Sequence, residues 1–295
     1  DPLDHLQEYV GRTTDRSVNK VFHMNEVFVD HLMPDIPELA EYREIPWHYP
    51  LVMFLVTVPL SFLILGMIGL KTGIVERRLD GKMQFLLTCI LFPLVLFALP
   101  GIAVYDGVRL FLISFPLLAI FVGRGGAVCW TWLSTKAGVL GQIVWVTLFA
   151  GAQVASMWLV QPSLLSDYSV GVGSLRGAGQ LGFEVTYWGD SLDRNFQIQV
   201  AEVVPEHARI GVVPVLHQFQ VQDLQQQSLI FRQHGIELVP FDPTHDDQPQ
   251  YVIAFFRKAD HSEQLTALLE ESELLVENRK QDVRLAGLYR LENLE

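Results

Sequence analysis

Four long apolar segments dominate the middle of the chain. They cover residues 49–70, 83–104, 108–123 and 138–160, and only the third contains a charged residue, Arg109 near its start. About 20 apolar residues in a helix cross the roughly 30 Å hydrocarbon layer of a bilayer. The third segment is short, and it extends past Arg124 toward Trp132 if that arginine reaches an interface. The pattern predicts an integral membrane bundle of about four helices over residues 49–161, because these segments have no polar face to present to water.

A polar flank, residues 1–48, precedes the bundle. Its apolar residues are spaced through 18–22 and 27–29, which we interpret as a mostly helical segment, and prolines then break it into an extended approach to the membrane. Trp47 and His48 lie where an aromatic belt is expected at a membrane boundary.

The second flank, residues 162–295, alternates strand-like and helix-like stretches. We expect a helix over 221–234 that stops at Gly235, and a helix over 262–271 that Ser262 caps. The strands are expected over 209–213, 236–241, 251–256 and 284–291. The alternation predicts a small α/β domain with some parallel strand pairing.

Composition and charge agree with this division. Hydrophobic residues make up 50% of the chain and charged residues only 18%, against about 25% in soluble domains. The net charge is −12, which disfavours binding to nucleic acid. The middle of the chain is net basic, whereas both flanks are acidic. The two cysteines, Cys89 and Cys129, provide neither a disulfide framework nor a zinc-type spacing.

Lysine and arginine predict the orientation of the bundle. Four of them lie in the loop at 71–82, and Arg124 and Lys136 lie between the third and fourth segments. Basic loops stay in the cytoplasm. Both flanks and the turn at 105–107 should therefore be extracytoplasmic, in a multi-pass membrane protein.

Asp106 and Arg109 form the sharpest candidate site. An arginine at the outer head of a membrane helix can hold a lipid phosphate with its planar guanidinium group, and the carboxylate and Tyr105 lie beside it. Alternatively, Arg109 simply anchors the helix at the interface and pairs with Asp106.

Three further side chains are candidates for binding. His48 can donate to a phosphate, or it can be an ordinary interfacial residue. Tyr187 and Trp188 can contact a sugar or an acceptor, or they can pack on the membrane surface. We expect no metal site, because His245, Asp246 and Asp247 lie in one turn-rich loop without a second cluster.

Three motifs carry a family resemblance over roughly residues 40–200. They are Pro46-Trp47-His48-Tyr49-Pro50, then Tyr105-Asp106-Gly107-Val108-Arg109-Leu110-Phe111-Leu112 with Pro116-Leu117-Leu118-Ala119, and Gly177-Ala-Gly-Gln-Leu-Gly182-Phe183-Glu184-Val185-Thr186-Tyr187-Trp188. The chain resembles the C-terminal half of bacterial family 39 glycosyltransferases, which are related to protein O-mannosyltransferases and to the aminoarabinose transferase of lipid A.

The resemblance implies a GT-C type membrane fold in a bacterial inner membrane, with an extracytoplasmic active site. It implies a polyprenyl-phosphate sugar as donor, an acceptor that the sequence does not specify, and a catalytic carboxylate in a first extracytoplasmic loop that we expect upstream of this chain. Arg109, Asp106, Tyr105 and His48 would then bind the lipid phosphate. Relatives often have histidine after the arginine, whereas Leu110 follows here, so Arg109 would act without the adjacent histidine that completes a two-residue phosphate clamp.

Two other classes of function stay open. One is a membrane-anchored module whose outer domain binds a ligand or serves as a scaffold. The other is part of a transport or export protein, although the absence of charge at mid-membrane positions disfavours coupled ion transport.

Overall fold

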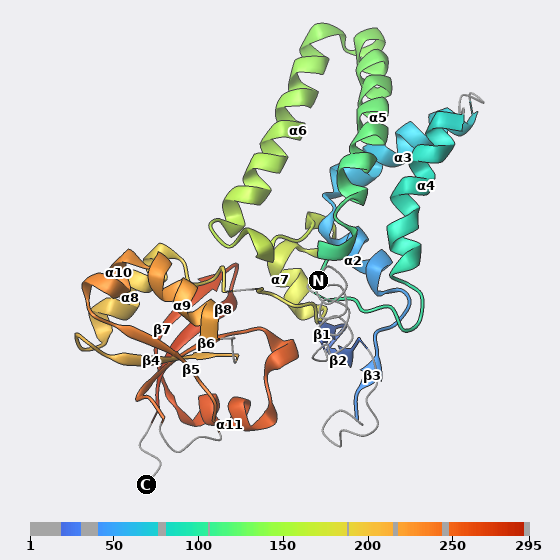
Figure 1. Ribbon diagram of the computed structural model, residues 1–295. Helices are drawn as coiled ribbons and strands as arrows, with labels where there is room; N and C mark the ends of the chain where they lie inside the picture. Colours follow the sequence, from blue (N-terminus) through green and yellow to red (C-terminus); the bar gives the residue numbers. More distant parts are fainter. Residues whose placement is uncertain are drawn as a thin grey trace, which may run out of the picture.

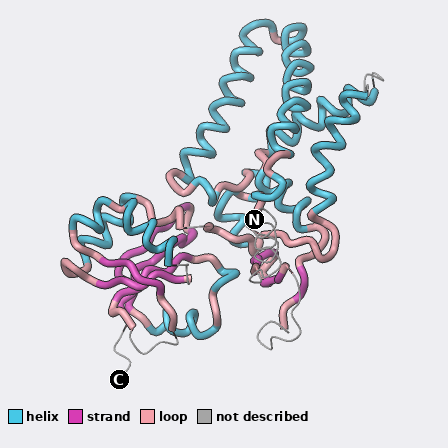
Figure 2. Tube along the Cα trace, in the orientation of Figure 1, coloured by secondary structure: helices cyan, strands magenta, loops and turns pink. Residues whose placement is uncertain are grey.

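The computed structural model describes residues 19–30, 41–75, 81–105, 107–187, 189–214, 218–243 and 248–291. A group of helices stands at one end of the molecule, and a separate α/β domain lies at the foot of these helices (Figures 1 and 2). The coarse prediction of a helical part followed by a small α/β domain is confirmed.

The helical part contains two helices that are long and apolar enough to span a membrane. These are α5 and α6, each of 23 residues. The bent pair α2–α3 passes the same test of composition if it is counted as one span, and α4 is shorter. The bounds are α2 Tyr49–Thr57, α3 Leu60–Val75, α4 Gly81–Leu96, α5 Ser114–Lys136 and α6 Gly138–Val160.

The first apolar segment is not the single helix that its composition predicts. α2 ends at Thr57, Val58 is extended, and α3 begins at Leu60 after a bend of 107°. The ring of Pro59 disfavours the helical conformation of the residue before it and provides no N–H for the helical ladder. The chain therefore turns sharply at this point.

The second and third segments are also shifted from their expected bounds. α4 ends at Leu96, and the chain returns through irregular backbone to Tyr105. A 3-10 turn, η2 (Arg109–Phe111), precedes α5, which begins at Ser114 and continues through Arg124 to Lys136. Arg109 thus precedes the long helix and does not lie inside it, whereas the fourth segment, 138–160, has the predicted bounds.

Helices α3 and α5 approach each other closely through glycines. A Cβ atom on Gly69 would overlap the carbonyl oxygen of Phe121, and a Cβ atom on Gly125 would overlap that of Leu65. Small residues let helix backbones pack at short range, which favours association in a membrane.

The described part of the first flank is a sheet, so the prediction of a mostly helical segment is wrong there. Strands β1 (Lys20–His23) and β2 (Glu26–Val29) form an antiparallel hairpin, and β3 (Arg43–Glu44) pairs parallel with β2. Met24 and Asn25 both have positive φ, as a two-residue type I′ turn requires. Alternating valine and phenylalanine residues favour strands once such a turn joins them.

The α/β domain contains a five-stranded sheet in the order β5-β4-β6-β8-β7. Strands β4, β5 and β6 are parallel, while β8 is antiparallel to both β6 and β7, so the predicted parallel pairing is confirmed. The strands are β4 Arg209–Val213, β5 Glu237–Pro240, β6 Tyr251–Phe255, β7 Glu273–Lys280 and β8 Val283–Arg290.

Helices cover both faces of this sheet. The expected helix over 221–234 is interrupted by Ser228, which caps the second of two shorter helices, and Ser262 caps α11 as predicted. α8, α9 and α10 pack on one face through Phe196, Val221 and Phe231, and α11 packs on the other. The helices are α7 Ser174–Gln180, α8 Arg194–Val203, α9 Gln218–Gln227, α10 Leu229–Gln233 and α11 Glu263–Glu271.

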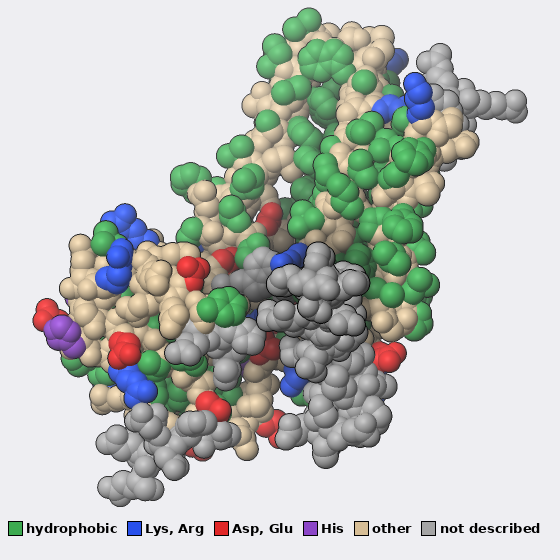
Figure 3. All heavy atoms as spheres, in the orientation of Figure 1, with side chains coloured by type: hydrophobic (Ala, Val, Ile, Leu, Met, Phe, Trp, Pro, Cys, Tyr) green, Lys and Arg blue, Asp and Glu red, His purple; other side chains and the backbone are tan. Residues whose placement is uncertain are grey.

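A shared core joins the helical part to the α/β domain. It combines Val21 of the hairpin, Tyr49 of α2 and Val160 of α6 with Phe183, which follows α7, and with Leu285 of β8. In the view of Figure 3, hydrophobic side chains cover the helical part, whereas acidic side chains gather on the lower half of the molecule. The helices and the α/β domain are therefore connected through buried contacts from distant segments.

We expect Gly125→Ala to separate α3 from α5 and to lower the stability of the helical part by about 1–3 kcal/mol, because the new methyl group overlaps the Leu65 carbonyl. Gly123→Ala on the same helix meets no atom within 4 Å and is the matched control. Thermal unfolding in detergent measures the difference, and equal stability of the two variants would contradict the close packing.

Candidate functional site

The three sequence motifs converge on one small pocket where the α/β domain meets the helices. Tyr49 comes from the first motif, Gly107 from the second, and Glu184 and Tyr187 from the third. The hairpin and the α/β domain complete its wall with Lys20, Val21, Phe22, Arg257 and Ala259. The cavity itself has a volume of only about 10 Å³. That volume holds about one water molecule and is far below the roughly 300–1,000 Å³ of a site that encloses a whole small molecule.

Glu184 is a buried carboxylic acid in the wall of this pocket. Its side chain is only 3% exposed, and its two carboxylate oxygens accept hydrogen bonds from the backbone N–H groups of Lys258 and Ala259, at 2.8 and 3.0 Å. These residues form the 3-10 turn η5 (Lys258–Asp260) of the α/β domain. Burial raises the pKa of Glu184 to about 7, although the backbone donors and nearby Arg257 act in the opposite direction. The Glu184 carboxylate therefore joins the third motif to the turn η5 of the α/β domain, which lies far away in the sequence.

A chain of hydroxyl groups runs beside this carboxylate. The hydroxyl of Tyr187 hydrogen-bonds to that of Tyr168, which donates to the backbone oxygen of Glu184 at 2.6 Å. Burial raises the pKa of both tyrosines, so both remain neutral. A Cβ atom on Gly107 would lie 3.1 Å from the Tyr187 hydroxyl oxygen. Tyr187 is therefore packed directly against the turn that leads to Arg109.

Arg109 lies two residues beyond Gly107, at the start of η2, and its side chain is exposed. Its guanidinium carbon is 5.8 Å from the centre of the Tyr105 ring, within the range of a cation–π contact. The two predicted site residues Tyr105 and Arg109 are thus brought together. Asp106, predicted as their partner, lies outside the described residues.

His48 lies beside a second histidine that sequence analysis missed. The ring centroids of His23 and His48 are 5.6 Å apart, and His23 also contacts the rings of Tyr49 and Phe183. His23 is only 1% exposed, and neither ring nitrogen has a hydrogen-bond partner among the described residues. Burial, with a smaller contribution from His48, lowers the pKa of His23 to about 4, so it is neutral at pH 7.

The remaining predicted residues divide as follows. Tyr187 is partly buried, and its hydroxyl is engaged inside the protein; Trp188 lies outside the described residues. Glu184 was not singled out from the sequence, although an isolated acid between Phe183 and Val185 is a signal of a buried, paired carboxylate. His23 gives no such signal, because its partners are distant in sequence.

No group of three or more histidine, cysteine or acidic side chains among the described residues is arranged to hold a metal ion. Residues 245–247, which we weighed as metal ligands, lie outside the described part of the chain. Comparisons with family models, with curated proteins and with solved structures find no match to this chain.

Glu184→Gln should loosen the attachment of the α/β domain. Both carboxylate oxygens accept backbone N–H groups, so an amide NH₂ in either place would face a donor. We expect a cost of about 1–3 kcal/mol and hydrogen exchange about tenfold or more faster at the amides of Lys258 and Ala259. The exposed Glu202→Gln on α8 is the control, and unchanged exchange at both amides would exclude this role.

The neutral state of His23 predicts an acid-sensitive core. Because folding lowers its pKa from 6.5 to about 4, its neutral form contributes stability that is lost as the pH falls through this window. Relative to His23→Phe, the protein with His23 should lose about 3 kcal/mol between these pH values. The raised pKa of Glu184 acts oppositely, since its contribution is lost as the pH rises toward about 7, but it is common to both proteins.

The measurement is thermal unfolding of both proteins in detergent over a series of pH values. A difference in stability that does not change with pH would contradict the burial of His23.

Proposed function

We propose that this protein is part of a membrane glycosyltransferase that moves a sugar from a polyprenyl-phosphate carrier to an extracytoplasmic acceptor. The observation that supports this proposal is the convergence of the three motifs on one pocket. The residues that carry the resemblance come from segments separated by many residues, and nothing in a chance similarity requires them to meet.

The charge distribution along the helices supports the orientation in this proposal. Lys71 near the end of α3, Lys82 near the start of α4 and Lys136 at the end of α5 lie at the end of the helices farthest from the α/β domain (Figure 1). Lysine is retained on the cytoplasmic side of a membrane. In a multi-pass arrangement of α2–α3, α4, α5 and α6, the pocket would lie at the outer boundary of the bilayer.

Arg109 would bind the phosphate of the donor in this arrangement. Its exposed guanidinium group follows the turn that lines the pocket, so a phosphate at the membrane boundary can approach it directly. The bond between the sugar carbon and the phosphate oxygen breaks as the acceptor oxygen attacks that carbon, and Arg109 stabilises the negative charge that develops on the leaving phosphate. Removal of the acceptor proton requires a base that we do not assign to this chain.

The Tyr187 hydroxyl would hold the turn at Gly107, and Glu184 would hold the α/β domain against the helices beside it. The pocket takes residues from the helices, the hairpin and the α/β domain together. This shared construction favours the transferase over a module in which the outer domain binds a ligand alone.

Arg109→Ala should weaken binding of undecaprenyl phosphate by about tenfold or more, because the charged bidentate contact with phosphate is lost. Arg109→Lys should bind the lipid with intermediate affinity, since an ammonium group keeps the charge but cannot make the two parallel hydrogen bonds of a planar guanidinium group. Native mass spectrometry of the protein in phosphatidylcholine nanodiscs, titrated with undecaprenyl phosphate, measures binding.

Two controls accompany this experiment. Arg290→Ala, at an exposed ion pair with Glu273, should bind the lipid normally. Phosphatidylglycerol should not compete, which distinguishes the polyprenyl carrier from ordinary anionic lipid. Equal binding by the Arg109 variants and the unchanged protein would refute the assignment, and the same variants should lose sugar transfer in the protein expressed from its complete reading frame.

A further inference from the structure

The two helical faces of the α/β domain differ in their exposed apolar side chains. α8, α9 and α10 expose four large hydrophobic residues, Ile198, Val203, Phe219 and Leu229, of which Phe219 is 66% and Leu229 58% exposed. The amphipathic helix α11, on the other face, buries Leu265 and Leu269 and exposes no large hydrophobic side chain. The face of α8–α10 is therefore unusual in leaving bulky apolar groups in contact with solvent.

The same two faces differ in charge. The basic residues of α8–α10, Arg194 and Arg232, are balanced by the acidic residues Glu202 and Asp223. α11 carries three glutamates and no basic residue. In a domain that is strongly acidic overall, the face of α8–α10 is locally neutral, and its remaining polar residues are mostly glutamines.

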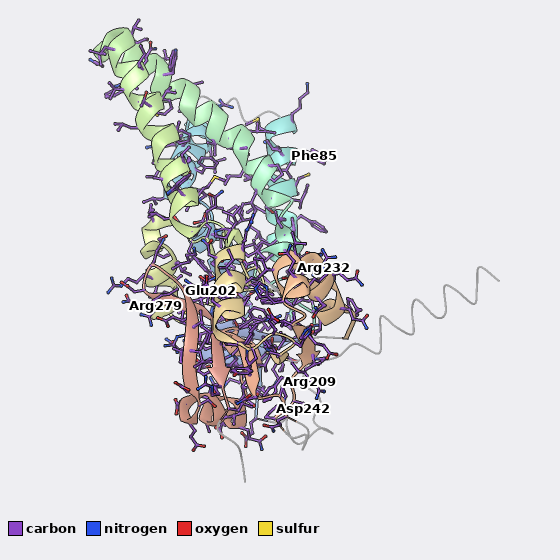
Figure 4. The ribbon with its side chains drawn as sticks, turned by 90° about the vertical axis from the view of Figure 1, so that its left-hand side faces the viewer. Phe85, Glu202, Arg209, Arg232, Asp242 and Arg279 are labelled. Atoms are coloured by element: carbon purple, nitrogen blue, oxygen red, sulfur yellow. The ribbon has the colours of Figure 1, made fainter. Side chains whose placement is uncertain are left out.

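The two faces also differ in their position relative to the long helices. α8 and α10 lie on the side of the domain nearest to α5 and α6, whereas α11 lies on the far side (Figure 1). In the perpendicular view, Glu202 and Arg232 lie toward the helices, Asp242 lies at the opposite end of the domain, and Phe85 marks α4 well above it (Figure 4). The 23 residues of α6 span about 34 Å, which matches one bilayer.

The lower boundary of that bilayer is marked by tryptophans. Trp158, two residues before the end of α6, is 75% exposed, and Trp47, just before α2, is 65% exposed. Tryptophan is enriched at the level of lipid headgroups. A bilayer bounded at this level would occupy the space directly above α8 and α10, beside α6 (Figure 1).

We propose that the face formed by α8, α9 and α10 rests on the outer surface of the bilayer that α5 and α6 span, with Phe219 and Leu229 in the headgroup region. This inference depends on the membrane placement in the proposed function. The apolar side chains gain from leaving water, and the balanced charges avoid the repulsion that an acidic face would meet at a membrane with anionic lipids. Docking would hold the domain at a fixed height over the pocket.

Site-specific labels in vesicles test this contact. Cys89 and Cys129 are replaced by alanine, and single cysteines are introduced as Phe219→Cys, Leu229→Cys and the matched control Gln264→Cys on the exposed surface of α11. Each is labelled with an environment-sensitive fluorophore in vesicles of phosphatidylcholine, with and without phosphatidylglycerol, that contain a headgroup nitroxide lipid as quencher. We expect quenching at positions 219 and 229 about twofold or more above that at 264, with little dependence on phosphatidylglycerol.

A fourth label separates failure of docking from failure of the membrane placement. Leu148→Cys lies on the exposed surface of α6 and should be quenched by a nitroxide deep in the acyl chains. Quenching at 148 with equal, weak quenching at 219, 229 and 264 would overturn the docking proposal alone and would indicate a protein partner or free solvent at this face. No quenching at 148 would overturn the membrane placement and the docking proposal together.

Discussion

The junction between the helices and the α/β domain depends on the hydrogen bonds that one buried carboxylate accepts. Glu184 lies in an apolar junction, where an ionisable group without partners would cost several kcal/mol. Within the described residues, its two oxygens accept hydrogen bonds from the turn at Lys258 and Ala259, more than seventy positions later in the chain. The third motif can be buried beside the helices only when the α/β domain docks and supplies those N–H groups, so the two parts of the molecule are structurally coupled at this point.

That coupling also assembles the candidate site. The hairpin lies between the two parts: His23 packs on Tyr49 and Phe183, while the Lys258 ammonium group lies 5.0 Å from the Phe22 ring centre. Each of these contacts brings a different segment to the pocket beside Gly107. The turn that would present Arg109 to a phosphate in the proposed function is packed against the Tyr187 hydroxyl.

In the helical part, the packing of the helices against each other has a different physical basis. In lipid the apolar surface of a helix gains little from contact with another helix, so association depends on close backbone packing. Gly69 and Gly125 permit that packing between α3 and α5, whereas α6 remains largely exposed along its length. The exposed apolar surfaces of α6 and of the α8–α10 face would meet the same bilayer, the first in its hydrocarbon layer and the second at its headgroups.

The sequence by itself determined the elements whose signals are local. The long uncharged run of α6, the strands of the parallel sheet and the serine cap of α11 follow from composition, periodicity and capping chemistry within a few residues. Arg109 and Tyr105 could be chosen as candidates because they adjoin in one motif. The tertiary structure alone decided where Pro59 redirects the first helix, that residues 20–29 form a hairpin, that His23 is buried in the junction, and which distant donors bind Glu184. Those outcomes depend on partners far away in the chain, and no local pattern specifies which distant group will satisfy a buried charge or cover an apolar strand.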